Sequence, residues 1–313
     1  MLLITVCWAS NIIAGKEALT GFSALALAQL RVTAAALIYA GCFLVAGDWS
    51  RLRLSLRQWL MLALTALSGM ASNQIFFICG MERTSVAHTG LIVALGPVMV
   101  LVIAVLLRME PLTGGKFAGM MISFAGIAVL TADRAGRGNG GQWSGDLIVL
   151  AGTAVFAVYT VLMKEIASEY DTLTLNTLVF GLAAIQMAPF CARAVFATHW
   201  TGLEWYAWWG LGFMVILGSV IPYLLFADAI KQLAASRAAA FNYLQPVIAS
   251  TLAIWVLSEK LTIKALIGGV LILVGVYLAE RERGEELSPV NQAAGAISAC
   301  ARNHVASSTT GPR

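Results

Sequence analysis

Apolar residues run almost without interruption through ten stretches of the chain, separated by short polar segments. Each stretch has about 20 residues, which is long enough to cross the hydrocarbon core of a bilayer as a helix. The strands of a membrane barrel instead alternate apolar and polar residues, so the pattern favours helices. The predicted spans are 1–19, 25–46, 58–80, 86–107, 114–133, 146–167, 172–195, 206–230, 236–257 and 262–280.

Two parts of the chain read as one sequence written twice. Residues 59–130 align without a gap with residues 208–279, so that Trp59 matches Trp208 at an offset of 149 positions. Further matched pairs are Gly69 with Gly218, Phe77 with Phe226, Pro97 with Pro246, Gly119 with Gly268 and Gly126 with Gly275. Five spans per copy is an odd number, so the second copy has to enter the bilayer in the opposite orientation. The sequence therefore predicts an all-α membrane protein with ten transmembrane helices in two inverted five-helix repeats.

The repeats also set the predicted domains, with residues 1–133 as the first repeat and residues 146–283 as the second. Residues 134–145 are rich in Gly and polar residues and are predicted to form a flexible linker. Residues 284–313 are small and polar and are predicted to be a disordered cytoplasmic tail. Lys and Arg are somewhat more frequent in the loops on the side of the N-terminus, which places both termini in the cytoplasm.

Composition agrees with a membrane protein and narrows its partners. Hydrophobic residues make up 59% of the chain and charged residues 12%, and the mean hydropathy is +0.83. An ordinary soluble domain has about 25% charged residues. The net charge of +4 is spread over short loops, so no nucleic-acid partner is expected. The five cysteines show no CxxC pairing, so no metal, disulfide or cofactor is expected. The expected partners are the lipid bilayer and a small-molecule substrate, and the chain is expected to act as a monomer or homodimer.

Ionisable residues inside the spans are few. A charge at mid-span is costly and is by default a functional candidate, but the acidic residues here, Asp146 among them, lie within about two turns of a span end, where a side chain can reach the interface. Arg31 lies about two turns into the second span. His88, at the start of the fourth span, could bind protons near neutral pH, but it aligns with Arg237, which favours an interfacial position for both. The absence of a central carboxylate argues against a proton or sodium site of the carboxylate type.

Pro97 and Pro246 fall in the middle of matched spans, where proline removes a backbone hydrogen bond and bends a helix. Such breaks are tolerated where neighbours or a water-lined cavity satisfy the freed carbonyl. Asn242 and Gln245 lie beside Pro246 on one helical face. They fit a cavity wall and, equally well, hydrogen bonds between helices.

Aromatic and amide residues recur at matched positions of the two halves. Trp8 and Asn11 in the first span correspond to Phe156 and Tyr159 in the sixth, at an offset of 148. Together with residues of the third and eighth spans they predict a central chamber with aromatic walls, which suits a substrate with an apolar side chain and an ammonium group. An aromatic packing layer is the alternative. The candidate substrate-binding residues are Trp8, Asn11, Asn73, Phe77, His88, Tyr159, Tyr223, Asn242 and Gln245.

Glycines at matched positions of the fifth and tenth spans leave faces of small residues. They include Gly119 and Gly126 in the fifth span and Gly268 and Gly275 in the tenth. Helices approach closely across such faces. These glycines are therefore predicted to form structural or dimer contacts rather than substrate contacts.

The order of these motifs resembles the drug/metabolite transporter superfamily and, within it, the ten-helix EamA-type exporters. The likeness rests on Trp8-Ala-Ser-Asn11 with Lys16, Gln29-Leu-Arg31, Thr84-Ser85 before Pro97 and Glu110-Pro-Leu-Thr, and Ala235-Ser-Arg-Ala before Gln245-Pro246 and Glu259-Lys-Leu-Thr. It covers about residues 1–280. The resemblance implies alternating access between inverted repeats and export of amino acids or related metabolites across the bacterial inner membrane; the aromatic amino-acid exporters are one possible comparison. Because the chain starts almost directly in the first span, a cytoplasmic leader is expected to be absent or trimmed.

Other functions fit the sequence less well. A drug or nucleotide-sugar carrier is the alternative within the superfamily, but a phosphorylated substrate needs several basic residues facing the cavity, and basic residues at mid-span are nearly absent. A membrane-embedded enzyme needs a nucleophile with a base, a carboxylate pair or a metal site, and the spans contain no such arrangement. A purely structural assembly protein would not explain two polar-lined halves. We therefore expect a secondary exporter and no enzyme activity.

Overall fold

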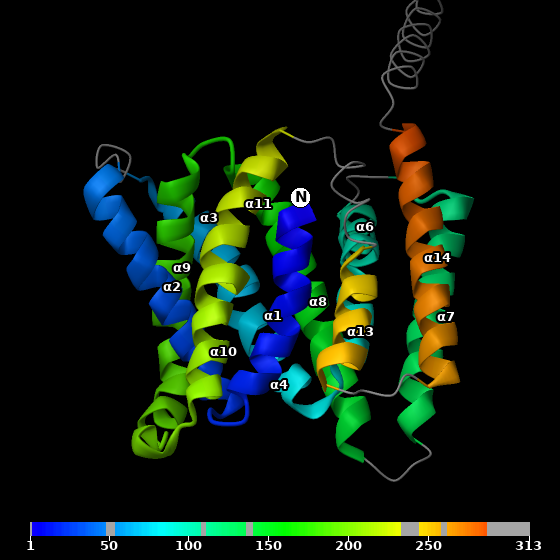
Figure 1. Cartoon of the computed structure of the whole chain (residues 1–313). Coiled ribbons are helices and arrows are strands. Elements are labelled where there is room, and N and C mark those ends of the chain that lie inside the picture. Colours follow the sequence, from blue (N-terminus) through cyan, green and yellow to red (C-terminus); the bar gives the residue numbers. More distant parts are fainter. Residues whose placement is uncertain are drawn as a thin grey trace, which may run out of the picture.

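The computed structural model describes residues 2–47, 54–107, 111–135, 140–232, 244–257 and 262–286. Helices make up nearly all of this part of the chain, and it contains no strand (Figure 1). The first-half helices are α1 (Leu2–Ala18), α2 (Ala24–Ala46), α3 (Leu56–Ala66), α4 (Asn73–Arg83), α5 (Val86–Val93), α6 (Gly96–Leu106) and α7 (Gly114–Ala135). Those of the second half are α8 (Gly140–Ile166), α9 (Thr172–Phe196), α10 (Trp205–Val215), α11 (Ile221–Gln232), α13 (Leu244–Leu257) and α14 (Ile263–Glu286), with a short 3-10 turn at Trp200–Gly202.

Polar side chains at the helix starts explain several of these boundaries. Ser23 accepts a hydrogen bond from the backbone N–H of Ala26 before α2, and Ser55 and Gln58 form a capping box before α3. Asp171 accepts from the N–H of Thr174 before α9. Each cap satisfies a backbone donor that has no partner within the helix.

Two long helices contain a wider, π-helical segment in the middle. The segment η2 (Leu67–Ser72) joins α3 to α4, and η4 (Ile216–Val220) joins α10 to α11. The helix starts Leu56 and Trp205, like the segment starts Leu67 and Ile216, are separated by the offset of the sequence repeat. The duplication therefore extends to a local distortion of the helix, which the sequence pattern did not predict.

The predicted helical class is confirmed for the described residues. Six helices are long and apolar enough to cross a membrane: Ala24–Ala46, Leu56–Arg83, Val86–Leu106, Trp143–Ile166, Thr172–Phe196 and Trp205–Ala229. Shorter apolar helices cover Gly114–Leu130, Gln245–Val256 and Ile263–Ala279. Around the expected linker, α7 continues to Ala135 and α8 already begins at Gly140.

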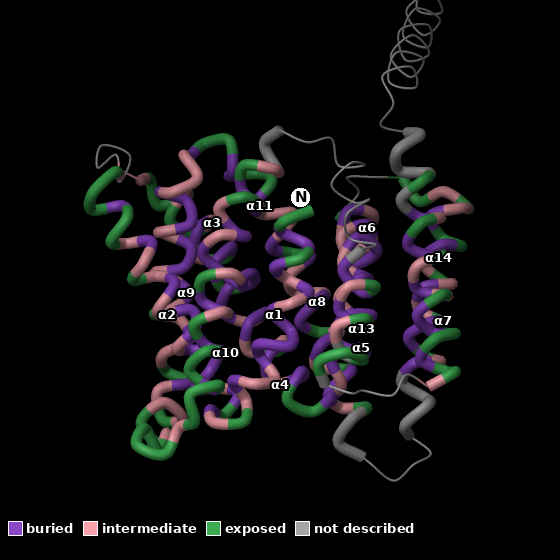
Figure 2. The backbone as a smooth tube through the Cα atoms, viewed as in Figure 1, coloured by how far each residue is buried: buried purple, intermediate pink, exposed green. Residues whose placement is uncertain are grey.

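The outward faces of the bundle are apolar. Val45, Phe190, Phe196 and Trp255 are among the large hydrophobic side chains that are mostly exposed. Figure 2 shows buried residues on the inner faces of the helices and exposed residues on the outer faces. An apolar exterior of this extent is unusual on a soluble monomer and fits a surface covered by lipid.

Helices α7 and α14 lie side by side and antiparallel, with their backbones in direct contact (Figure 1). A Cβ on Gly119 would lie 2.6 Å from the carbonyl oxygen of Gly275, and one on Gly126 would lie 2.8 Å from that of Gly268. The hydroxyl of Ser123 donates to the carbonyl of Ile272, its counterpart at the offset of 149 positions. The predicted small-residue faces therefore make a contact within the chain.

The close approach of α7 and α14 gives a stability prediction. Gly119→Leu should destabilise the protein by about 2 kcal/mol, because the added side chain meets the backbone of α14, which can move only with the whole helix. Gly181→Leu is the matched control, since a Cβ on Gly181 in α9 meets nothing within 4 Å. The melting temperatures of both variants would be compared with wild type in detergent. Equal melting temperatures for the two variants would contradict the prediction.

Candidate functional site

Aromatic rings from three helices meet in the interior of the bundle. The ring of Trp8 on α1 lies 5.7 Å from that of Tyr223, 5.4 Å from Phe226 and 6.2 Å from Phe156, measured between centroids. Tyr159 on α8 continues the group, 5.2 Å from Phe156 and 6.4 Å from Tyr223. These distances are those of favourable aromatic pairs. The structure thus brings together Trp8 and Phe156, which the sequence matched between the halves, with Tyr159, Tyr223 and Phe226.

Two amide side chains complete this group, which we call the central layer: Trp8, Phe156, Tyr159, Tyr223 and Phe226 with Asn11 and Gln74. Gln74 on α4 donates to the hydroxyl of Tyr223 at 3.5 Å, and these positions are again 149 apart. The side-chain oxygens of Asn11 and Gln74 are buried and have no hydrogen-bond partner within the described part of the chain. Buried acceptors without a partner are uncommon in folded proteins and need an explanation.

Asn11 and Tyr159, which the sequence matches to each other, each cover a glycine in a π-helical segment of the other half. A Cβ on Gly218 in η4 would lie 2.0 Å from the side-chain oxygen of Asn11. A Cβ on Gly69 in η2 would lie 2.1 Å from the ring of Tyr159. Each glycine is therefore required for the close approach of a helix from the other half.

Arg31 is fully buried and holds η4 from α2. Its Nε donates to the hydroxyl of Ser219 at 2.8 Å, and its Nη2 donates to the carbonyl oxygen of Gly218 at 2.9 Å. The hydroxyl of Tyr39 donates to the carbonyl of Val220 at 2.8 Å. The third nitrogen of Arg31, Nη1, is buried and has no partner among the described residues. Arg31 is not among the site residues predicted from the sequence. Its depth in a span was the feature that could have identified it as a functional residue.

Other predicted site residues lie outside the central layer. Asn73 donates to the backbone carbonyl of Gly152 at 2.9 Å and so ties α4 to α8. Phe77 is partly buried and packs against the main core. Gln245 is buried near the start of α13, whereas Asn242 lies outside the described residues.

The two predicted helix-bending prolines lie at different places in their helices. Pro97 is in the first turn of α6, directly after an interruption between α5 and α6. Pro246 is the third residue of α13 and lies beside Gly90 of α5. Whether either proline bends a helix during a transport cycle stays a prediction.

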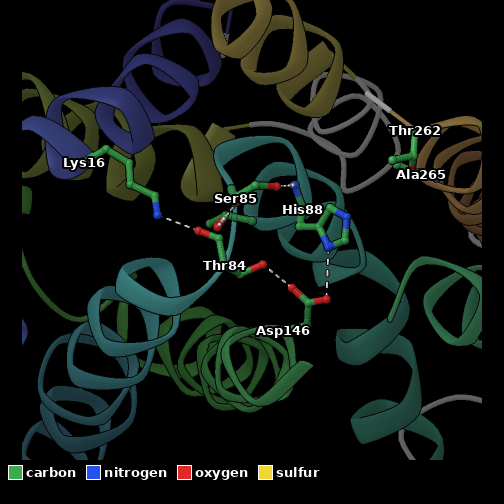
Figure 3. A network of polar contacts seen from close by, with 8 residues as sticks. Lys16, Thr84, Ser85, His88, Asp146, Thr262 and Ala265 are labelled. Carbon is green, nitrogen blue, oxygen red and sulfur yellow. Dashed lines mark hydrogen bonds and ion pairs between the residues drawn. The ribbon is translucent and has the colours of Figure 1, made fainter. Parts of the chain in front are cut away.

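A network of polar side chains, three of them buried, lies near the end of α1 and the starts of α5 and α8 (Figure 3). The ammonium of Lys16 donates to the backbone carbonyl of Thr84 at 2.5 Å, and the hydroxyl of Thr84 donates to Asp146. The other carboxylate oxygen of Asp146 lies 3.0 Å from Nδ1 of His88, whose backbone N–H is capped by Ser85. We call Lys16, Thr84, His88 and Asp146 the end network.

The end network differs from the expectation that His88 and Asp146 are interfacial residues. His88 and Asp146 are 1% and 2% exposed, so neither side chain reaches the interface. The sequence did not reveal their pairing, because they are 58 residues apart and lie on different helices.

Among the described residues, no three His, Cys, Asp or Glu side chains are grouped so that they could hold a metal ion.

Together, the apolar exterior and the six candidate spans define a multi-pass membrane protein. A model of the EamA-like transporter family matches residues 1–132 and 143–280, which is most of the chain. The chain therefore belongs to the EamA-like transporter family, within the drug/metabolite transporter superfamily that the motifs resemble. The family is named for transport rather than for catalysis.

Individual relatives agree with this assignment. The chain is 27% identical over 283 residues to the "Probable terminal-alkyne amino-acid exporter" of Streptantibioticus cattleyicolor, covering 90% of this chain and 92% of that protein. It is 24% identical over 284 residues to an "Uncharacterized transporter" of Archaeoglobus fulgidus, covering 90% and 98%. A solved crystal structure has the same fold, with a TM-score of 0.64, 19% identity and coverage of 91% of this chain and 96% of that one.

The contacts of Arg31 predict a large effect on stability. Arg31→Leu is expected to lower the free energy of unfolding by about 3 kcal/mol, because it removes the charged donor from Gly218 and Ser219. Arg193→Leu on the exposed side of α9 is the control and should change it little. Thermal unfolding in detergent would measure both, and an Arg31 variant as stable as its control would rule out the anchoring role.

Proposed function

We propose that this chain is a secondary transporter that exports small amphipathic metabolites, with amino acids as the substrate class, by alternating access around the central layer. The observation that carries the proposal is the presence of buried polar atoms without partners among aromatic rings in the interior of an EamA-family bundle. The proposed location is the bacterial inner membrane, with both termini in the cytoplasm.

Atoms in the central layer and on the neighbouring Arg31 can each bind one group of an amino acid. The free oxygens of Asn11 and Gln74 can accept hydrogen bonds from an ammonium group. The free Nη1 of Arg31 can donate to a carboxylate, and the side chains of Arg31 and Asn11 both approach Gly218. The faces of Trp8 and Tyr223 can bind an apolar side chain and attract the ammonium group. Substrate binding would therefore satisfy groups that the empty bundle leaves without partners.

Alternating access follows if ten spanning helices form two inverted repeats, and the contacts support this part of the proposal. In an assembly with two-fold symmetry, if residue i of one copy contacts residue j of the other, j also contacts i. The contacts of α7 with α14 have this reciprocity, since Gly119 meets Gly275 while Gly126 meets Gly268. Because these helices are antiparallel, the symmetry axis would run perpendicular to them, in the plane of the membrane.

The axis itself would pass where a residue meets its own counterpart. Ser123 contacts Ile272 between α7 and α14, and Gln74 contacts Tyr223 in the central layer. The proposed substrate site would therefore lie on the axis and be shared by both halves. Rocking of one half against the other would then expose the site to each side of the membrane in turn.

The substrate class also draws on a relative. The Streptantibioticus cattleyicolor protein is named as an amino-acid exporter, and the chain covers most of its length. A phosphorylated substrate fits less well, because it would need several cationic side chains around it, and two of the three side-chain nitrogens of Arg31 are already bonded to η4.

Flux measurements test the central layer. Trp8→Ala and Asn11→Ala should each lower the flux of a transported amino acid by about tenfold, since each removes a contact to its charged groups. Trp255→Ala is the matched control, because this Trp is 84% exposed on α13 and should face lipid. Purified variants would be reconstituted in liposomes at equal protein content and tested with a panel of labelled amino acids.

Two outcomes would contradict the proposal in different ways. If wild-type protein moves no amino acid, with or without a proton gradient, the substrate class is wrong. If flux occurs but both variants transport normally, the substrate does not bind at the central layer.

A further inference from the structure

The end network contains a titratable pair in a place where charge is costly. His88 and Asp146 lie in the first turns of the candidate spans Val86–Leu106 and Trp143–Ile166, and both are almost completely buried. Ionisable residues inside membrane spans are rare and mark ion or substrate pathways more often than packing sites. The central layer is built from other residues, so the proposed substrate site does not account for this pair.

The geometry allows the pair to gain one proton. One carboxylate oxygen of Asp146 accepts a hydrogen bond from the hydroxyl of Thr84, and the other lies 3.0 Å from Nδ1 of His88. In the tautomer that carries its hydrogen on Nδ1, the ring of His88 donates to this second oxygen. His88 then keeps Nε2 as its site for a further proton. Nε2 is buried and has no partner among the described residues. Binding a proton there would convert a negatively charged pair into a neutral ion pair.

Charged residues of α1 and α4 lie near the pair. Lys16 on α1 reaches the same network through the carbonyl of Thr84, and Glu82 and Arg83 end α4 with exposed side chains. The backbone and Cβ of Arg83 pack against Gly145, the residue before Asp146. The side chains of residues 131–142 lie outside the described part of the chain.

The end network also crosses the boundary between the two halves. Lys16, Thr84 and His88 come from the first half, and Asp146 comes from α8 of the second half (Figure 3). A rocking motion of the halves would therefore have to break these bonds. A proton on Nε2 would be a buried donor without an acceptor in the present arrangement, so its uptake favours opening of the network toward water.

We propose that His88 and Asp146 form a proton-binding site through which the transport cycle is coupled to the proton gradient. In each cycle a proton from one side of the membrane binds to Nε2 of His88, and it leaves to the other side after the halves have moved. This inference rests on the proposed transport function and adds its coupling ion. No group other than the proton is transferred.

The first experiment needs no substrate. The chain has three histidines, His88, His199 and His304, so histidine-labelled protein in nanodiscs should give three resolved ring signals by NMR. The His88 signal, assigned by its loss in His88→Gln, should shift with pH as the ring binds a proton. In Asp146→Asn this pH dependence should change, because the neighbouring carboxylate is gone. The signal of exposed His199 should not change in that variant.

The second experiment measures coupling. In proteoliposomes, a tenfold proton gradient should stimulate wild-type flux of a transported amino acid. His88→Gln and Asp146→Asn should lose this stimulation, and the matched control His199→Gln should keep it.

The outcomes separate this inference from the proposed function. A His88 signal that does not change with pH, or that is unaffected by Asp146→Asn, overturns the proton site. Wild-type flux that ignores the gradient, or that stays gradient-stimulated in both variants, overturns the coupling. If wild-type protein moves no amino acid at all, the proposed function fails, and the NMR experiment alone decides whether the pair binds a proton.

Discussion

The binding of η4 by Arg31 and Tyr39 is the interaction on which the interior of this bundle depends. A π-helical segment shifts the backbone hydrogen bonds, so that some carbonyl groups inside the membrane need other donors. Here a guanidinium and a phenol from α2 supply them to Gly218 and Val220. The segment is thereby fixed at the point where Asn11 lies against Gly218. The position of the central layer follows from this bonding, because Tyr223 and Phe226 project from the helix that continues η4.

The need for close packing between helices explains why glycines occur where the halves touch. Helices in lipid gain little from burying apolar side chains, so their association relies on close packing and on hydrogen bonds between helices. The backbones of α7 and α14 meet at Gly119, Gly126, Gly268 and Gly275, and the hydroxyl of Ser123 adds a bond at the crossing. Contacts of this kind add to the apolar core that residues of both halves share, and they fix the register of α7 against α14.

The sequence was sufficient for the helices and for the set of aromatic residues, because both depend on local patterns and on the repeat. The start of α3 and α10 at equivalent positions follows from the duplicated pattern. The rings of Trp8, Tyr159 and Tyr223, three of the predicted site residues, lie in one group. These features needed only hydropathy and alignment of the chain with itself.

What the sequence did not reveal depends on which helices become neighbours. A π-helical segment has no hydropathy signal, so η2 and η4 were not predicted. Asn73 is a polar residue of the kind expected in a chamber wall. Its side-chain amide instead donates a hydrogen bond to the carbonyl of Gly152 on the neighbouring helix α8. Asp146 stands near the end of a span, and only the packing of α4 and α5 against α8 removes it from water.

The Arg31 contact has no equivalent in the other half, and this difference has a consequence for the resting state. Helices α2 and α9 start at Ala24 and Thr172, so the position matching Arg31 is Val179, which cannot donate a side-chain hydrogen bond to η2. Arg31 and Val179, at matching positions of the two halves, therefore differ in their ability to form hydrogen bonds. Under the proposed alternating access, two conformations exchanged by the two-fold axis but stabilised by unequal bonds differ in free energy, and their populations at equilibrium differ accordingly. An idle carrier of this kind would spend most of its time facing one compartment, waiting there for cargo.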